Sequence, residues 1–274
     1  MNKKIIEANI EVHSKMADSY HNEPHFRPEN QEKVRKRIIE LQKKANAKNL
    51  LDVGCGTGFI INLSKDLFDE LHGVDATQAM LDKVDLSSGN IILHNKLAQE
   101  LPFEDESFDM ASSYAFLHHL ENYSDVLKEV LRVLKKGGLY YIDLDPNKDF
   151  WTAMETLEKI ENNDKYSPIV QKEINSVLHT DQQVMDEFGI EPEVFNNAEY
   201  TKSILGGIDP KELCKIAVEM GYSNATFEYD WFLGQGTIMH KHSFEEAEAI
   251  DKYLKMALPL SKHLYKYITV VLEK

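Results

Sequence analysis

Short apolar runs alternate with amphipathic stretches between residues 49 and 145, and this alternation constrains the fold more than any other feature of the chain. The runs have the length of strands and read NLLDVG, ELHGVDA, NIILHNK, FDMASSY and LYYIDLD. The stretches between them include GFIINLSKDLF, TQAMLDKVDL and SDVLKEVLRVLKK, which have the pattern of helices. Strands that alternate with helices are typical of a parallel sheet covered on both faces. We therefore predict an α/β fold with a Rossmann-like, doubly wound core. The KKGG at Lys135–Gly138 predicts the end of the preceding helix.

The rhythm changes after Asp145 and returns near residue 206. Residues 146–205 contain helical patterns and no strong strand, and we interpret them as an inserted helical cap for the substrate. DPKELCKIAVEMGY then predicts a helix, and NATFEYDWFL and KYITVVLEK complete a mostly parallel sheet of seven strands. We also expect a second insertion over residues 235–262. The predicted organisation is an N-terminal helical segment over 1–48, a core over 49–145 and 206–274, and the cap between them.

Composition excludes several classes of protein. The formal net charge is −15, which argues against a nucleic-acid partner. No run approaches the roughly 18 apolar residues of a membrane span, and charges interrupt the N-terminal stretch where a signal peptide would need an apolar core. The two cysteines, Cys55 and Cys214, give neither a disulfide framework nor a metal spacing. We therefore expect a cytoplasmic protein that has no membrane partner and no metal.

Glycines at alternate positions follow the first predicted strand, and their spacing indicates the kind of ligand. Gly54, Gly56 and Gly58 form GxGxG, whereas a dinucleotide fold shows GxGxxG and a P-loop continues into Lys-Ser/Thr. Asp52 ends the strand, where a carboxylate would repel phosphate but accept hydrogen bonds from an ammonium group. Asp75 ends the next strand, where a carboxylate commonly holds ribose hydroxyls. The ligand is expected to be adenosine-like and to carry an amino group, with no need for a phosphate.

These segments resemble the class I SAM-dependent methyltransferases, in the right order from about Asn49 to Asp145. The segments that carry the resemblance are LLDVGCGTG, GVDATQAML, LAQELPFEDESFD, SSYAFLHHL and EVLRVLKKGGLYYI. They are most similar to the branch that methylates small molecules, the ubiquinone/menaquinone methyltransferase-like group. The resemblance implies S-adenosyl-L-methionine (SAM) as cofactor. It also implies transfer of the sulfonium methyl to O, N or C of a small organic acceptor by in-line displacement.

The resemblance also implies roles for individual residues around SAM. Asp52 and the backbone of the turn would hold the methionine moiety, and Asp75 the ribose. Leu97 and Ala98 stand where the family usually has an Asp followed by a small residue. The complete set of expected cofactor-binding residues is Tyr20, Arg27, Asp52, Gly54, Cys55, Gly56, Asp75, Ala76, Met80, Leu97, Ala98, Ser113 and Tyr114. Within it, Ala76 and Met80 flank the adenine, Ser113 and Tyr114 lie beside the sulfonium, and Tyr20 and Arg27 engage the carboxylate.

His118 and His119 are the candidate catalytic residues, because we expect them to end the fourth strand near the methyl group. Since successive strand side chains face opposite ways, at most one should face the site, and we favour His118 as a base or substrate ligand. In the alternative interpretation, both histidines only pack at the strand end. The HKH at His240–His242 has no carboxylate or cysteine partner with ligand spacing, so no metal site is predicted there.

Three other functions stay open at this point. The chain could modify SAM without transferring its methyl, or it could bind SAM or a partner without catalysis. A nicotinamide oxidoreductase is the remaining alternative, and the GxGxG spacing and Asp52 argue against it.

Overall fold

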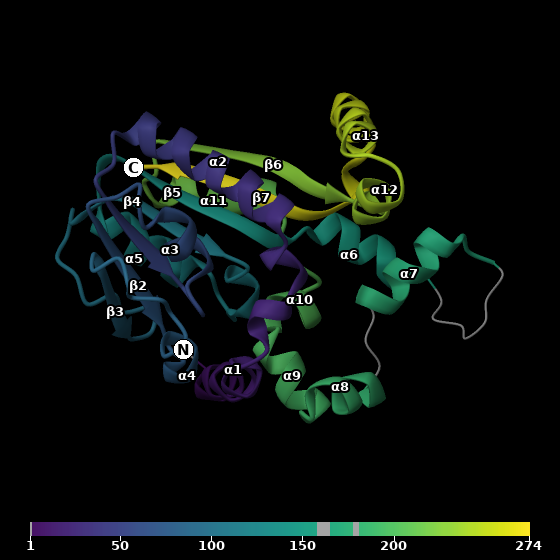
Figure 1. The fold of residues 1–274 in the computed structure, drawn as a ribbon, viewed down its shortest axis with the longest axis horizontal. Helices are drawn as coiled ribbons and strands as arrows, with labels where there is room; N and C mark the ends of the chain where they lie inside the picture. The colour runs from purple at the N-terminus through teal and green to yellow at the C-terminus, as the bar shows by residue number, and fades with distance from the viewer. Residues whose placement is uncertain (1, 158–164, 178–180) are drawn as a thin grey trace.

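The computed structural model describes residues 2–157, 165–177 and 181–274. Their centre is a seven-stranded sheet with the order β3-β2-β1-β4-β5-β7-β6 (Figure 1). Strands β1 to β5 run parallel to one another, and β7 runs antiparallel to both β5 and β6. This arrangement confirms the predicted mostly parallel, doubly wound sheet. The strands are β1 Asn49–Val53, β2 Glu70–Asp75, β3 Ile91–Asn95, β4 Phe108–Tyr114, β5 Leu134–Pro146, β6 Asn224–Phe232 and β7 Tyr265–Glu273.

Helices cover both faces of the sheet, because neighbouring strand residues point to opposite sides. In β1, Leu50 packs with helix α2 (Pro28–Ala45) and α3 (Phe59–Ser64). The next residue, Leu51, packs on the other face with α5 (Ser124–Val133) and α11 (Pro210–Met220). The short α4 (Gln78–Leu81) follows β2. Apolar runs buried on both sides are what a covered parallel sheet requires.

The end of α5 differs from the prediction. The helix ends at Val133, and the KKGG segment belongs to β5, where Leu134 already pairs with Phe108 of β4. Lys135 is held there by an ion pair with Asp109, at 2.7 Å between Nζ and Oδ1. Gly137 adopts a φ of +77° within the strand rather than at a helix terminus. Lys135 therefore lies in the first part of strand β5 and does not cap the helix.

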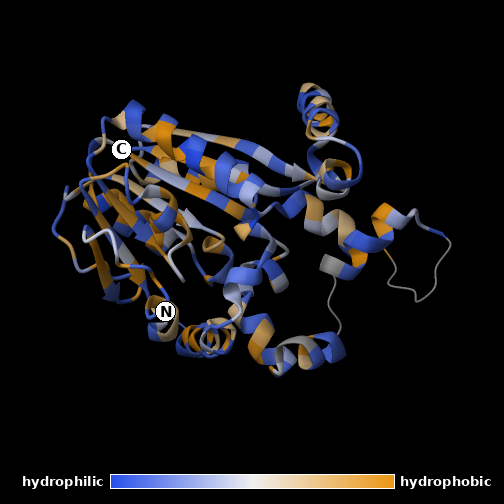
Figure 2. Cartoon of the chain, viewed as in Figure 1, coloured by the Kyte–Doolittle hydropathy of each residue, from blue (hydrophilic) through white to orange (hydrophobic). Residues whose placement is uncertain are grey.

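The N-terminal segment leads from its first helix to α2, which packs on one face of the sheet. Helix α1 (Lys3–Met16) is followed by the 3₁₀ turns Tyr20–Asn22 and Pro24–Phe26 and then by α2. Figure 1 shows α1 between α4 and α9, and residues of α1 pack against both helices. Figure 2 shows hydrophobic and hydrophilic positions mixed along α1 and α9, as expected for amphipathic helices.

The regular elements that the structure describes after Pro146 and before residue 206 are helices, as the sequence predicts. One apolar cluster joins α6 and α7, and a second joins α8 and α9 to α1 through Val12 and Phe195. The region 235–262 is also helical, and Ser243 caps α13 by accepting a hydrogen bond from the Glu246 N–H. In the described ranges, no helix is long and apolar enough to cross a membrane. The helices of both regions are α6 Lys148–Glu155, α7 Pro168–Val177, α8 Asp181–Phe188, α9 Pro192–Ala198, α10 Tyr200–Ser203, α12 Gln235–Lys241 and α13 Phe244–Met256.

Candidate functional site

A cavity of about 370 Å³ lies at the carboxyl ends of β1, β2 and β4. The glycine turn after β1 forms one wall, with φ of +71° at Gly54, +52° at Gly56 and +86° at Gly58. Residues that carry a side chain rarely adopt this left-handed backbone conformation. A Cβ atom at Gly54 would also lie 2.1 Å from Cδ2 of Phe116, a distance that no real contact allows. The GxGxG spacing therefore follows from backbone conformation and from close packing beside the cavity.

Asp75 joins the end of β2 to the glycine turn. Its carboxylate accepts hydrogen bonds from the backbone N–H of Gly56 at 2.9 Å and of Thr77 at 2.8 Å. Burial raises the pKa of Asp75, and these two bonds act in the opposite direction. The carboxylate lines the cavity and keeps unused acceptor capacity, so it can accept a further hydrogen bond from a ligand.

Asp52 is almost completely buried at the end of β1 and also lines the cavity. Ser112 Oγ donates a hydrogen bond to its Oδ1 at 2.8 Å. Burial raises the pKa of Asp52 to about 7, the Ser112 hydrogen bond opposes this rise, and the negative charge of Asp75 adds to it. A cationic group in the cavity would compensate the buried charge, so the site suits a ligand that carries an ammonium.

Most of the residues predicted to contact SAM line this one cavity. They are Tyr20, Asp52, Gly54, Cys55, Gly56, Asp75, Ala76, Met80, Leu97, Ala98 and Tyr114. Two predicted residues do not. Arg27 is exposed at the start of α2, away from the cavity lining. Ser113 is buried and accepts a hydrogen bond from the Tyr140 hydroxyl at 2.9 Å, because it points to the opposite face of β4 from Ser112.

The N-terminal helix contributes residues to the cavity that sequence reasoning did not identify. Ile5, Ile6, Asn9 and His13 of α1 all line it. Asn9 Nδ2 also donates a hydrogen bond to the carbonyl oxygen of His119 at 3.2 Å. The only signal in the sequence was the amphipathic pattern of the helix, which does not tell a cavity wall from a packing surface. Helix α1 therefore closes one side of the cavity.

The two candidate catalytic histidines do not end the fourth strand, contrary to the prediction. Strand β4 stops at Tyr114, because Ala115 takes a φ of +51°, and the histidines lie in the 3₁₀ turn Leu117–His119. The strand rule of opposite faces therefore does not apply to them. His119 lines the cavity and His118 does not, so the geometry favours His119 over the predicted His118 as the residue that faces the site.

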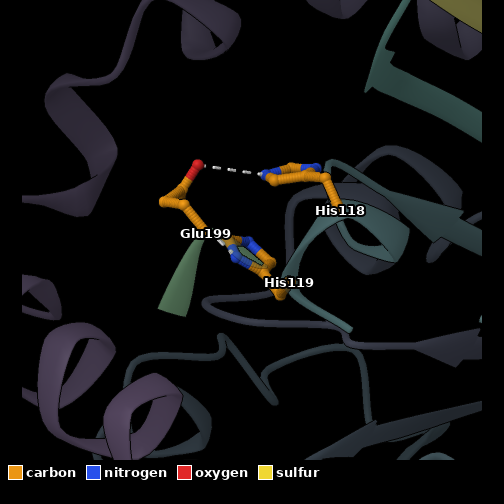
Figure 3. A group of neighbouring side chains, drawn as sticks. All are labelled: His118, His119 and Glu199. Carbon is orange, nitrogen blue, oxygen red and sulfur yellow. Dashed lines mark ion pairs between the residues drawn. The ribbon is translucent and has the colours of Figure 1, made fainter. Parts of the chain in front are cut away.

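Both histidine side chains converge on Glu199, which precedes α10 (Figure 3). The distance from His118 Nε2 to Glu199 Oε2 is 3.7 Å, and that from His119 Nδ1 to Oε1 is 3.5 Å. Burial acts to raise the pKa of Glu199, but Lys202 and the two histidines outweigh it and hold this pKa far below its usual range. Burial also lowers the pKa of His119. An ionised carboxylate therefore faces the two imidazoles at the edge of the cavity.

His240 of the HKH segment lies elsewhere. Its Nε2 is 3.0 Å from Oε1 of Glu29, so it does have a carboxylate neighbour, which the sequence spacing did not indicate. Neither residue lines the cavity.

Comparison with known proteins agrees with this geometry. Residues 51–142 match the model of the methyltransferase domain family. The demethylmenaquinone methyltransferase of Listeria welshimeri is 37% identical over 129 residues, which cover 43% of this chain and 55% of the relative. The same enzyme of Staphylococcus aureus is 39% identical over 111 residues, 38% of this chain and 46% of the relative. The chain thus spans about half the length of the curated relatives it matches.

Solved structures with the same fold include a SAM-dependent methyltransferase from Archaeoglobus fulgidus, with a TM-score of 0.54 and 18% identity. That match covers 89% of this chain and 94% of the other. A SAM-dependent methyltransferase of Thermotoga maritima, described as a possible histamine N-methyltransferase, gives a TM-score of 0.51 and 14% identity over 97% and 99% of the two chains. At this identity the likeness concerns the fold alone. The predicted resemblance to class I SAM-dependent methyltransferases is confirmed: residues 51–142 match the methyltransferase domain family, and this match and the curated relatives support SAM as the cofactor.

Proposed function

We propose that this protein transfers the methyl group of SAM to a small organic acceptor. The observation that carries the proposal is the single cavity that unites the glycine turn, Asp52 and Asp75 under helix α1. Its volume of about 370 Å³ lies in the range of small-molecule sites. The match to the methyltransferase domain family over residues 51–142 supports the same activity.

The residues of the cavity fit the chemical groups of SAM. Asp52 offers a buried negative charge for the α-ammonium, and the bare turn lets backbone amides approach the ligand. Asp75 has free lone pairs for ribose hydroxyls while the backbone of Gly56 and Thr77 fixes its orientation. Ala76, Met80 and Leu97 give an apolar wall for the adenine. Tyr20 and Tyr114 border the same cavity, so both stay in the proposed site, whereas Arg27 and Ser113 leave it.

When bound, SAM supplies a methyl group already activated by the sulfonium, so the protein's main task is alignment of the acceptor. Helix α1 would keep water from the methyl group, because Ile5 and Ile6 form part of the wall. We assign His119, rather than His118, as the residue that contacts the acceptor. His118 instead positions the turn through Asp145, at 2.8 Å between Nδ1 and Oδ1.

The acceptor is proposed to be small because the cavity is bounded by α1 and by the turn that carries the histidines. The family match ends at residue 142, before the helices α6 to α10, so the acceptors of the relatives do not transfer to this chain. No described residue of 146–205 lines the cavity itself, and the cap touches the site through Glu199 beside His119. Its role in substrate binding remains a proposal.

Isothermal calorimetry with SAM and, in parallel, with NAD tests the cofactor. We expect binding of SAM and none of NAD, and the reverse result would overturn the proposal. Mass spectrometry after incubation with SAM and a library of small metabolites tests the reaction. S-adenosylhomocysteine together with an acceptor heavier by one methylene unit supports methyl transfer. A SAM-derived product that still carries the methyl would indicate the SAM-modifying alternative, and binding without any product across the library would favour a silent SAM-binding protein.

A further inference from the structure

His118, His119 and Glu199 bring two imidazoles and one carboxylate together at the edge of the cavity (Figure 3). All three are buried, and one ligand atom from each lies within 4.8 Å of the other two. Two imidazoles and a carboxylate are a donor set that binds divalent transition metals such as zinc or ferrous iron. We propose that these residues form a site for one divalent transition-metal ion.

Hydrogen bonding leaves Nε2 of His118 as a free electron-pair donor. Its Nδ1 lies 2.8 Å from Asp145 Oδ1, and the same oxygen accepts the backbone N–H of His118 at 3.0 Å. An oxygen that accepts in both bonds requires the imidazole proton to sit on Nδ1. The lone pair of Nε2 then faces Glu199 Oε2 at 3.7 Å. Two electron-pair donors at this distance are expected to repel each other unless a cation lies between them.

His119 has a support of the same kind, but the nitrogen that makes this hydrogen bond is also the one nearest Glu199, at 3.5 Å between Nδ1 and Oε1. Its Nδ1 lies 2.8 Å from the carbonyl oxygen of Ala198, which can only accept, so the proton again sits on Nδ1. The unprotonated nitrogen is therefore Nε2, which becomes a metal ligand only after the ring turns toward Glu199. Metal-binding histidines commonly donate their other ring N–H to a carboxylate or a carbonyl in this way, which fixes the orientation of the ring. Asp145 and the Ala198 carbonyl supply both types of support.

The spacing suits an ion after small shifts. Bonds of about 2.0–2.2 Å at tetrahedral angles separate ligand atoms by roughly 3.3–3.6 Å. The pair His118 Nε2 and Glu199 Oε2 already stands at 3.7 Å, and the whole set requires shifts of about an ångström. Lys202 Nζ lies 2.8 Å from Glu199 Oε2 and orients the carboxylate, while Oε1 keeps its lone pairs. Three protein ligands leave coordination positions open for an exogenous group.

His119 is the member of the cluster that lines the cavity, so an open position of the ion would border the space proposed for the acceptor. This suits an acceptor that carries an oxygen ligand, such as a hydroxyl group beside a carbonyl or a second hydroxyl. The ion would favour loss of the hydroxyl proton to water, the oxygen would bond to the methyl carbon, and the carbon–sulfur bond would break with its electrons on sulfur. This role rests on the proposed function, whereas metal binding itself does not.

The test is a titration of the chelator-treated protein with Co²⁺, followed by visible absorption and calorimetry. We expect one tight equivalent with d–d bands of a low-coordinate nitrogen and oxygen site. Glu199→Gln should weaken this binding by roughly tenfold or more, and Asp145→Asn by about 10- to 100-fold. His72→Gln is the matched control, because His72 and His94 also form a pair, at 3.0 Å, with Glu70 near His72, but outside the cavity. It should leave the tight equivalent unchanged.

Absence of a tight equivalent, or its loss in His72→Gln but not in Glu199→Gln, would overturn the proposal. Anomalous diffraction at the cobalt edge of the unmodified protein locates the ion without any variant, so a variant that fails to fold does not decide the outcome. Cobalt density between the two histidines and Glu199 supports the site, and density elsewhere refutes it. SAM calorimetry on the same metal-free protein separates the two proposals: SAM binding without Co²⁺ binding refutes only the metal site.

Discussion

Replacement of Asp75 by asparagine gives the most direct test of how the cavity holds its ligand. Each oxygen of the carboxylate accepts one backbone N–H, from Gly56 and from Thr77, and the Thr77 side chain also hydrogen-bonds to the group, so the remaining acceptor capacity serves a ribose hydroxyl. Asparagine has one acceptor oxygen and one amide donor. Whichever way it turns, its NH₂ group faces one of the two backbone donors, and one ribose acceptor is lost.

The size of the effect follows from these contacts. A hydrogen bond to a charged group contributes about 1.5–3 kcal/mol, so the loss of one ribose contact should raise the Kd for SAM roughly 10- to 150-fold. The lost backbone bond should also lower the melting temperature of the ligand-free protein, because the Gly56 or Thr77 N–H loses its partner.

Calorimetry with SAM and with S-adenosylhomocysteine measures the affinity, and differential scanning fluorimetry measures the stability. Asp82→Asn is the matched control, since Asp82 is an exposed carboxylate directly after α4 that accepts a hydrogen bond from Gln78. It should change neither quantity appreciably. An unchanged Kd for Asp75→Asn, with the protein folded, would refute the assignment of the ribose site to the end of β2.

Three further perturbations test other parts of the cavity. Gly54→Ala should abolish SAM binding, because the new Cβ would meet Phe116, whereas Gly137→Ala has a similar φ and open space and should show only the strain of about 1–2 kcal/mol in denaturant unfolding. Because the pKa of Asp52 is about 7, SAM affinity should fall by about an order of magnitude from about pH 7.5 to about pH 6, and Asp52→Asn should remove this dependence in calorimetry. Asn9→Ala should raise hydrogen exchange in α1 and weaken SAM binding severalfold, and unchanged exchange would show that the bond to the His119 carbonyl does not hold the helix.

The same shift of Asp52 predicts how stability depends on pH. The folded-state pKa is raised above the unfolded value near 3.8, so the ligand-free folded protein binds a proton that the unfolded chain has already lost between about pH 4 and pH 7. This group therefore lowers the free energy of unfolding as the pH rises through that window. Asp52→Asn should flatten this part of the stability curve in urea unfolding.

The sequence could predict which residues line the cavity around the glycine turn because the determinants of that turn are local. The strand pattern places Asp52 and Asp75 at neighbouring strand ends, and the positive φ of the turn demands glycine whatever the rest of the chain does. The predictions for Ser113 and for the two histidines were wrong where the local pattern does not determine the position of a side chain. Ser113 was misplaced because the alternation along β4 turns Ser112, not Ser113, toward Asp52. The histidines were assigned to a strand that stops at Tyr114.

Glu199 could not be found from the sequence at all. It follows α9 in a helical stretch without a motif, and it meets His119 only because α8 and α9 pack their apolar faces on α1. Long-range packing of this kind has no spacing signal, since many amphipathic helices share the same pattern. The same limit applies to Asn9, whose contact with the His119 carbonyl depends on where α1 docks.

The cofactor side and the acceptor side of the site are built from different parts of the chain. The acceptor side can therefore change between relatives while the cofactor side is kept. Apart from Tyr20, strand ends and backbone amides of one continuous segment, within residues 51–142, build the proposed cofactor half. The acceptor half combines that segment with α1 and with Glu199, which lie outside the family match. A relative could therefore keep every SAM contact and lose the cluster of His118, His119 and Glu199 by one substitution in the inserted helices. Similarity to known methyltransferases therefore supports SAM as the cofactor of this protein. The methyl acceptor has to be inferred from α1, the histidine turn and Glu199 instead.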